Sequence, residues 1–211
     1  MAGTKEAIAV VFDIGSSMRN LETPSVFENA KNCISMIIQR KIFSESKDEI
    51  ALILFGTDEA KSNSAADGKN QYKNIEMCQT LAPASWELLE FVNKIEATDV
   101  PTDFIMEKAL LVAIDLLQNQ TIGKKFVSQR ILLFSCFSSA FSDDSLSDLC
   151  EEIKNNKIDI NIIGPVSYAD EETNSLDSSE AYCAKTSIQI KTEDNIKKLL
   201  KEVNGESYSF E

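Results

Sequence analysis

The 211-residue sequence contains no histidine, and this absence narrows the chemistry open to it. Without an imidazole there is no Ser-His-Asp or Cys-His catalysis and no histidine-ligated metal site. No glycine-rich P-loop occurs either. An enzyme built from this chain would need carboxylates, lysine or a hard cation. We therefore expect a protein that is not an enzyme and that uses no cofactor.

Basic residues, paired cysteines and long apolar runs are also scarce. The chain has 34 acidic against 21 basic side chains and a net charge of −13, which disfavours a nucleic-acid surface and suits basic partners or solubility. Its five cysteines are widely spaced without a C-x-x-C motif, as in a reduced intracellular protein. No apolar run approaches membrane-spanning length, and the polar residues after Met1 do not resemble a signal peptide. We expect no membrane association.

Apolar runs of strand length alternate along the chain with segments of helical periodicity. The predicted strands are 6–13, 48–56, 72–82, 130–137, 157–166, 186–190 and 207–210. The predicted helices are 24–43, 86–95, 101–119, 145–156 and 192–203, with Pro24, Pro101 and Thr192 at helix starts. This alternation predicts a doubly wound, Rossmann-like α/β fold, a mainly parallel sheet with helices on both faces. We expect one domain over 1–211, with a flexible acidic loop within 165–190.

The first strand ends in Asp13-Ile14-Gly15-Ser16-Ser17, at the edge of the sheet where α/β proteins bind ligands. A phosphate-binding turn of the sugar-kinase type would need a following hairpin and a second domain, and the sequence favours neither. A D-x-S-x-S metal site would use Asp13, Ser17 and Thr102. The favoured interpretation is a tight turn in which Gly15 takes an unusual conformation and a serine caps the next helix.

Two oxygens that such a metal site needs are missing from the sequence. Gly15 occupies the middle position of the motif and has no side-chain oxygen. The strand over 130–137 carries Cys136 where a carboxylate is wanted, and a thiol is a poor magnesium ligand. We interpret Asp13, Ser17 and Thr102 as a degenerate site and predict no tightly bound metal. Cys136 is expected to be a packed small residue rather than a reactive thiol, since no histidine can activate it.

The helix predicted over 101–119 carries an aliphatic residue on its polar side. At 100° per residue, Leu111 lies nearly opposite the apolar stripe, beside Glu107, Asp115 and Gln118. Ile114 falls at the margin of that polar side. Single exposed leucines are common, and a neighbouring edge strand could also cover them. Alternatively the helix and the edge strand, with Tyr72 as one wall, form a groove that suits a short basic and hydrophobic peptide.

Several stretches resemble a known family. The α/β order with DIGSS after the first strand resembles a von Willebrand factor A domain. More specifically, the chain is similar to the amino-terminal domain of the larger subunit of the Ku heterodimer. The similar stretches are KDEIALILFGTDE (47–59), QYKNI (71–75), QTIGKKF (120–126), the FSS-x-FS run (137–142) and YSF (208–210).

The resemblance implies a function that the amino-acid composition alone does not indicate. Ku caps DNA double-strand breaks in the nucleus and recruits the non-homologous end-joining machinery. It threads DNA through a ring domain that this chain lacks, as in a domain excised from a longer protein that pairs with the smaller Ku subunit. The resemblance implies a non-enzymatic platform that docks short Ku-binding motifs of end-joining factors. By similarity, the peptide-binding positions are Tyr72, Leu111, Ile114, Asp115 and Gln118.

The alternative is an adhesion-type A domain. In that case Asp13, Ser17 and Thr102 would hold magnesium, and the metal would bind an acidic residue of a ligand. A hydrolase or phosphotransferase that works at Asp13 is disfavoured, because no paired carboxylates accompany it in a single motif.

Overall fold

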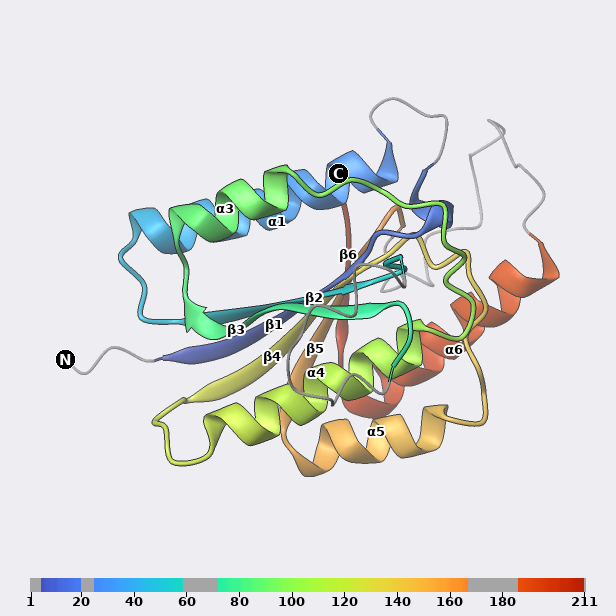
Figure 1. Ribbon diagram of the computed structural model, residues 1–211. Coiled ribbons are helices and arrows are strands. Elements are labelled where there is room, and N and C mark those ends of the chain that lie inside the picture. The colour runs from blue at the N-terminus through green and yellow to red at the C-terminus, as the bar shows by residue number, and fades with distance from the viewer. Residues whose placement is uncertain (1–4, 20–24, 59–71, 167–185, 211) are drawn as a thin grey trace, which may run out of the picture.

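The computed structural model describes residues 5–19, 25–58, 72–166 and 186–210 (Figure 1). Its strands are β1 (Glu6–Asp13), β2 (Glu49–Phe55), β3 (Ile75–Pro83), β4 (Ser128–Phe134), β5 (Ile158–Gly164) and β6 (Glu206–Ser209). Its helices are η1 (Ser16–Met18), α1 (Val26–Phe43), α3 (Trp86–Asn93), α4 (Met106–Thr121), α5 (Leu146–Asn155) and α6 (Ser187–Val203). Helices α1 and α3 cover one face of the sheet, here the upper face, and α4, α5 and α6 cover the lower face (Figure 1).

The strand order is β3-β2-β1-β4-β5-β6. All neighbours pair in parallel except β2 and β3, which are antiparallel. The direction of winding reverses between β1 and β4, so the switch point of the sheet lies at the carboxyl ends of these two strands. The predicted doubly wound, mainly parallel fold is confirmed, as is the place of β3 at a sheet edge.

The central strands are buried on both faces, which explains their unbroken apolar sequences. In β1, Ala7, Ala9 and Val11 belong to the core under the lower helices. The alternate residues Ile8 and Val10 belong to the core under α1 and α3. Two hydrophobic layers therefore hold the sheet from opposite sides, and a parallel sheet covered in this way requires apolar residues at nearly every position.

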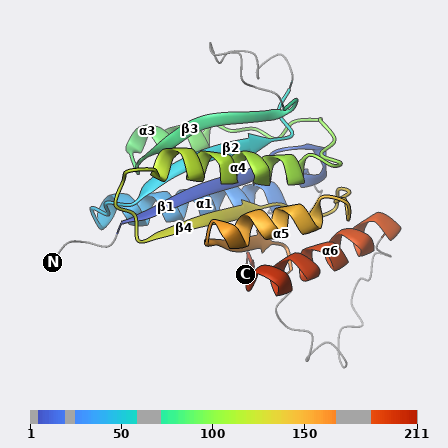
Figure 2. The same ribbon diagram turned by 90° about the horizontal axis from the view of Figure 1, so that it is seen from below.

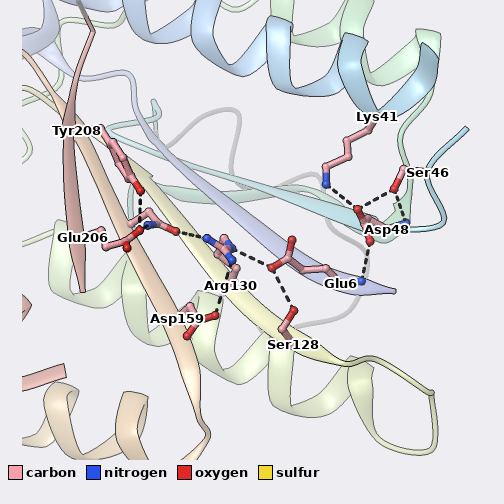
Figure 3. Close-up of polar contacts among 10 residues, drawn as sticks. Glu6, Lys41, Ser46, Asp48, Ser128, Arg130, Asp159, Glu206 and Tyr208 are labelled. Carbon is pink, nitrogen blue, oxygen red and sulfur yellow. Dashed lines mark hydrogen bonds and ion pairs between the residues drawn. The ribbon is translucent and has the colours of Figure 1, made fainter. Parts of the chain in front are cut away.

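A polar network crosses the upper face near the amino ends of the strands (Figure 3). Arg130 on β4 donates to Glu6 of β1 at 2.9 Å and to the side-chain oxygen of Asn161 on β5 at 2.8 Å. The Asn161 amide donates to Glu206 of β6 at 3.0 Å, and the Tyr208 hydroxyl donates to the same carboxylate at 2.6 Å. Side chains of four strands are thus joined in one chain of hydrogen bonds.

The predicted start of the helix over 101–119 at Pro101 is wrong. Helix α4 begins at Met106, and Phe104 has a φ of 57°, which a continuous right-handed helix does not tolerate. The Phe104 N–H instead donates to the carbonyl of Ala140, so this segment belongs to a loop at the carboxyl edge of the sheet. Helix α1 begins at Val26 with Ser25 as its N-cap, and Pro24 lies outside the described residues.

The predicted strand over 186–190 is also wrong. Thr186 is the N-cap of α6, and its side chain forms a capping box with Gln189, so 187–190 are helical rather than extended or loop. Thr192, the predicted cap, is buried within α6 and donates to the carbonyl of Ser139. Residues 167–185, the rest of the predicted flexible loop, lie outside the described residues. Among the helices that are described, none is long and apolar enough to cross a membrane.

Candidate functional site

Asp13 lies at the switch point, where it joins the two strands that flank the crevice. Its Oδ1 accepts the N–H of Gly15 at 2.9 Å, and its Oδ2 accepts the hydroxyl of Ser135, just after β4, at 2.8 Å. The side chain is almost completely buried. The carboxylate therefore ties β1 to β4 at the point where related folds leave room for a ligand.

Burial also changes the acidity of this group. It raises the pKa of Asp13 from 3.8 to about 6, although the hydrogen bonds from Gly15 and Ser135 act in the opposite direction. The nearby Cys136 thiol also has a raised pKa, first because it is buried and second because the charge of Asp13 disfavours a thiolate. A protonated thiol is a weak nucleophile, which agrees with the expectation that Cys136 is a packed residue.

The remaining members of the degenerate site are brought together as hydroxyls that bond to one another. Thr102 Oγ1 lies 2.6 Å from Ser139 Oγ and 3.4 Å from Ser17 Oγ. Ser139 Oγ in turn lies 3.3 Å from Ser17 Oγ. The Cys136 thiol lies 2.7 Å from the Ser138 hydroxyl and 3.4 Å from the carbonyl oxygen of Ser17. The structure thus brings Ser17 and Thr102 into contact at the edge of the sheet where β1 ends in Asp13.

These residues do not fit a tightly held divalent cation. A hard cation of this kind requires about six oxygen ligands, usually with more than one carboxylate. Here Asp13 is the one carboxylate, and both of its oxygens already accept hydrogen bonds. Within the described ranges, no group of three or more histidine, cysteine or acidic side chains could hold a metal. No step of the function below is therefore assigned to a metal.

A glycine is required at position 15 because its neighbours leave no room for a side chain. Its backbone conformation does not require a glycine. Its φ of −74° and ψ of −179° are ordinary extended values, so the predicted unusual conformation is wrong. No side chain caps η1, and the serine that caps a helix after this turn is Ser25, at the start of α1. A Cβ at Gly15 would lie 2.3 Å from Thr102 Cγ2 and 2.7 Å from the carbonyl oxygen of Val100. The loop before α4 therefore packs directly against this glycine.

The second candidate surface is the outer side of α4. Leu111 is half-buried, Gln118 is half-buried and Asp115 is exposed, as the helical wheel predicts. Ile114 is only 1% exposed, so its predicted position at the margin of the polar side is wrong. Glu107 is buried too and accepts the N–H of Ser142. Ser142 belongs to the loop before α5, and Ile114 is part of the lower core. A wheel drawn for one helix contains no information about such neighbours.

The orientation of α4 bears on the predicted groove between this helix and the edge strand. Gln118, seven residues after Leu111 and on the same side of α4, donates to Glu152 of α5. Gln120 marks the other side, because its side chain accepts the N–H of Leu81 on β3. Helix α4 lies between β3 and α5 in the view from below (Figure 2). Leu111 is thus on the α5 side of the helix, whereas Tyr72 precedes β3.

Both residues pack against the lower core, Leu111 from α4 and Tyr72 from the segment before β3. Val112, another half-buried residue that packs against this core, was missed by the sequence reasoning because the wheel counted it within the apolar stripe. Met77 was missed as well. It lies two residues after the buried Ile75 on edge strand β3 and so shares its face of the sheet, yet it is 40% exposed. We call Tyr72, Val112, Leu111, Asp115 and Gln118 the α4 surface.

Comparison with known proteins gives a family match over nearly the whole chain. The family described as the Ku70/Ku80 N-terminal alpha/beta domain matches residues 7–205. The X-ray repair cross-complementing protein 5 of Xenopus laevis is 38% identical over 171 residues, which are 80% of this chain and 23% of that protein. The protein of the same name from Dictyostelium discoideum is 28% identical over 207 residues, 95% of this chain and 25% of that protein.

A plant relative carries a different name. The ATP-dependent DNA helicase 2 subunit KU80 of Arabidopsis thaliana is 29% identical over 117 residues, 56% of this chain and 16% of that protein. The chain thus spans a quarter or less of the length of these relatives.

The fold also has a counterpart among solved structures. The crystal structure of the SpRpn10 VWA domain aligns with 98% of this chain and 89% of that chain, with a TM-score of 0.59 and 16% identity. This likeness confirms the predicted von Willebrand A-type fold.

Proposed function

The chain belongs to the Ku70/Ku80 N-terminal alpha/beta domain family, and on that premise we propose that it is a non-enzymatic docking domain of a Ku DNA-end-binding complex. In this role it binds short basic and hydrophobic Ku-binding motifs of end-joining factors during double-strand break repair in the nucleus. The proposal treats residues 1–211 as one domain. DNA contact and pairing with the smaller Ku subunit then belong to other parts of the complex, since the relatives are about four times as long as this chain.

The observation that carries this proposal is the α4 surface. Tyr72, before β3, and Leu111, on α4, present half-buried apolar groups against the lower core, and Asp115 presents an exposed carboxylate on α4. A short peptide bound there would bury apolar side chains against Tyr72 and Leu111 and pair a basic residue with Asp115. The net charge of −13 favours the approach of a basic peptide.

The closed switch point supports the non-enzymatic part of the proposal. The crevice in which an α/β enzyme would bind its substrate is bridged by the hydrogen bond between Asp13 and Ser135. The chain has no histidine that could act as a general base. The name of the plant relative includes a helicase, and that protein is several times longer than this chain.

Substitutions on the α4 surface test the proposal. Leu111→Lys and Tyr72→Lys each remove an apolar contact and repel a basic peptide. We expect each to weaken binding of a fluorescent Ku-binding peptide from an end-joining factor by about tenfold or more, as measured by anisotropy. Asp115→Asn should weaken it by about threefold, since one exposed charge pair is lost.

A matched control is Asn155→Lys, which adds the same charge at an exposed position on α5. This variant should bind the peptide like the parent chain, and circular dichroism should show that all variants remain folded. Parental affinity in both folded lysine variants, Leu111→Lys and Tyr72→Lys, would contradict the proposed surface.

A further inference from the structure

A recess lies on the upper face of the sheet beyond the end of α3. The eight residues of α3 span about 12 Å, whereas the nine residues of β3 below it span about 30 Å. The helix starts near the amino ends of the parallel strands and stops before their carboxyl ends (Figure 1). Among the described residues, the part of β2 and β3 that α3 does not cover lines a cavity of about 620 Å³.

The floor of this recess is apolar. Ile14, Leu54 and Ile95 line it and are buried in the upper core. Phe91, from the last turn of α3, lines it as well and is 43% exposed, although its neighbours on the core side of the helix are buried. An aromatic side chain beside an apolar floor gives a partner a place to bury an aliphatic group.

The rim of the recess is acidic. Asp58, Glu76 and Glu96 line it, and none of the three forms an ion pair with any residue in the described part of the chain. Among the described residues of the lining, Lys94 is the one basic side chain, and it already pairs with Glu90 at 2.6 Å. The carboxyl end of α3 adds partial negative charge at the same place. The recess therefore favours a cation.

An unpartnered polar group gives a second, independent indication of a ligand. Thr57 lines the recess and is 3% exposed, and its Oγ1 has no hydrogen-bond partner among the described residues. The position of Thr57 is fixed, because its N–H donates to the carbonyl of Asn74 at 3.2 Å and its own carbonyl accepts the Asn74 side chain at 2.6 Å. Leaving a buried hydroxyl unpaired is unfavourable, and a hydrogen-bonding ligand would remove that penalty.

We propose that this recess docks a short basic peptide, with an aliphatic side chain over Phe91 and the apolar floor and a neighbouring arginine or lysine among the three carboxylates. A nucleic acid or an anionic membrane would be repelled by the same charges. The recess and the α4 surface lie on opposite faces of the sheet, so this proposal stands independently of the function proposed above.

The test uses the peptide Lys-Arg-Leu-Arg-Lys as a probe and follows the backbone amide resonances of the domain during titration. We expect saturable shifts at Thr57, Glu76, Phe91 and Glu96, and smaller shifts at Leu111. Glu76→Gln and Glu96→Gln should each weaken binding by about threefold. Glu87→Gln, which removes the same charge from the exposed first turn of α3, should leave binding unchanged.

Thr57→Val separates binding from folding. Removal of the unpaired hydroxyl should raise the melting temperature of the free domain and weaken the probe's affinity, whereas a merely structural role would change stability alone. The proposal is overturned if the probe does not bind, if its shifts centre on the α4 surface, or if its affinity is the same in Glu76→Gln, Glu96→Gln and Glu87→Gln.

Discussion

Asp13 lies where a ligand would enter the sheet, and the chain itself satisfies both of its carboxylate oxygens. Gly15 supports this arrangement, because its lack of a side chain lets Thr102 and Val100 approach. Asp13 and Gly15, which point to the fold in the sequence, therefore stabilise the interior of the protein and do not form a binding site. Because its carboxylate is buried, the pKa of Asp13 is raised.

The raised pKa predicts an unusual pH dependence. Between pH 3.8 and about 6 the folded state keeps a proton on Asp13 that the unfolded chain has released. The Asp13 contribution to stability is therefore full below pH 3.8 and is lost as the pH rises through about 6. Asp13→Asn cannot titrate, so the unfolding free energy of the parent should fall relative to this variant by up to about 3 kcal/mol between pH 4 and pH 7.

Urea unfolding of both chains at several pH values measures this difference. Asp144→Asn, at an exposed position, is the control and should follow the parent at every pH. Parallel stability curves for the parent chain and Asp13→Asn would show that Asp13 does not titrate in this range.

Among the helices and strands, α6 is an element that the alternation of apolar residues predicted wrongly. TSIQI alternates like a strand, yet the Thr186 hydroxyl accepts the N–H of Gln189 at 3.2 Å and the Gln189 side chain accepts the N–H of Thr186 at 2.8 Å. This reciprocal pair starts a helix, and Ile188 and Ile190 remain exposed on it. The T-x-x-Q spacing was present in the sequence and is the signal that would have corrected the prediction.

Loss of this cap should weaken the start of α6. We expect Thr186→Ala to lower the unfolding free energy by about 1 kcal/mol and to speed amide hydrogen exchange over 187–190. Ser187→Ala, one residue later, removes a hydroxyl that does not cap the helix and should change either quantity little. Equal exchange rates in the two variants would rule out the capping box as the main stabiliser of this end.

The central strands were predictable because their burial on both faces forces continuous apolar runs, as in β1 and β2. Helix starts were less predictable. Pro101 suits a first turn, but the positive φ of Phe104 and its bond to Ala140 depend on a loop far away in sequence. The same holds for the α4 surface. The wheel identified Leu111 and Asp115 correctly, whereas the burial of Ile114 depends on neighbours that no single-helix pattern includes.

For the molecule as a whole, the network around Arg130 links β1, β4, β5 and β6 across the upper face (Figure 3). Asn161, at its centre, is 4% exposed and depends on Arg130 as donor to its side-chain oxygen. Hydrophobic layers fix the sheet at its middle, and this network fixes the relative positions of strands that are distant in sequence. Its energetic importance lies in keeping buried polar groups paired.

Arg130→Met tests that importance. It keeps the apolar stem of the side chain, leaves the Asn161 side-chain oxygen without its donor and leaves Glu6 with the Ser128 hydroxyl, so we expect a loss of about 1–3 kcal/mol in unfolding free energy. Lys125→Met, a loss of the same charge at an exposed site, should change stability by less than about 0.5 kcal/mol in the same urea titration. Equal stability of the two variants would mean that water replaces the guanidinium at no cost.

The packing around Gly15 has a consequence for the engineering of a metal site at this edge of the sheet. A designed site would need a serine at position 15 and a carboxylate at position 136, yet a Cβ at position 15 would collide with Thr102 and Val100. Either substitution alone would add strain or a buried charge without completing a ligand set. The loop before α4 would therefore have to be redesigned together with both positions.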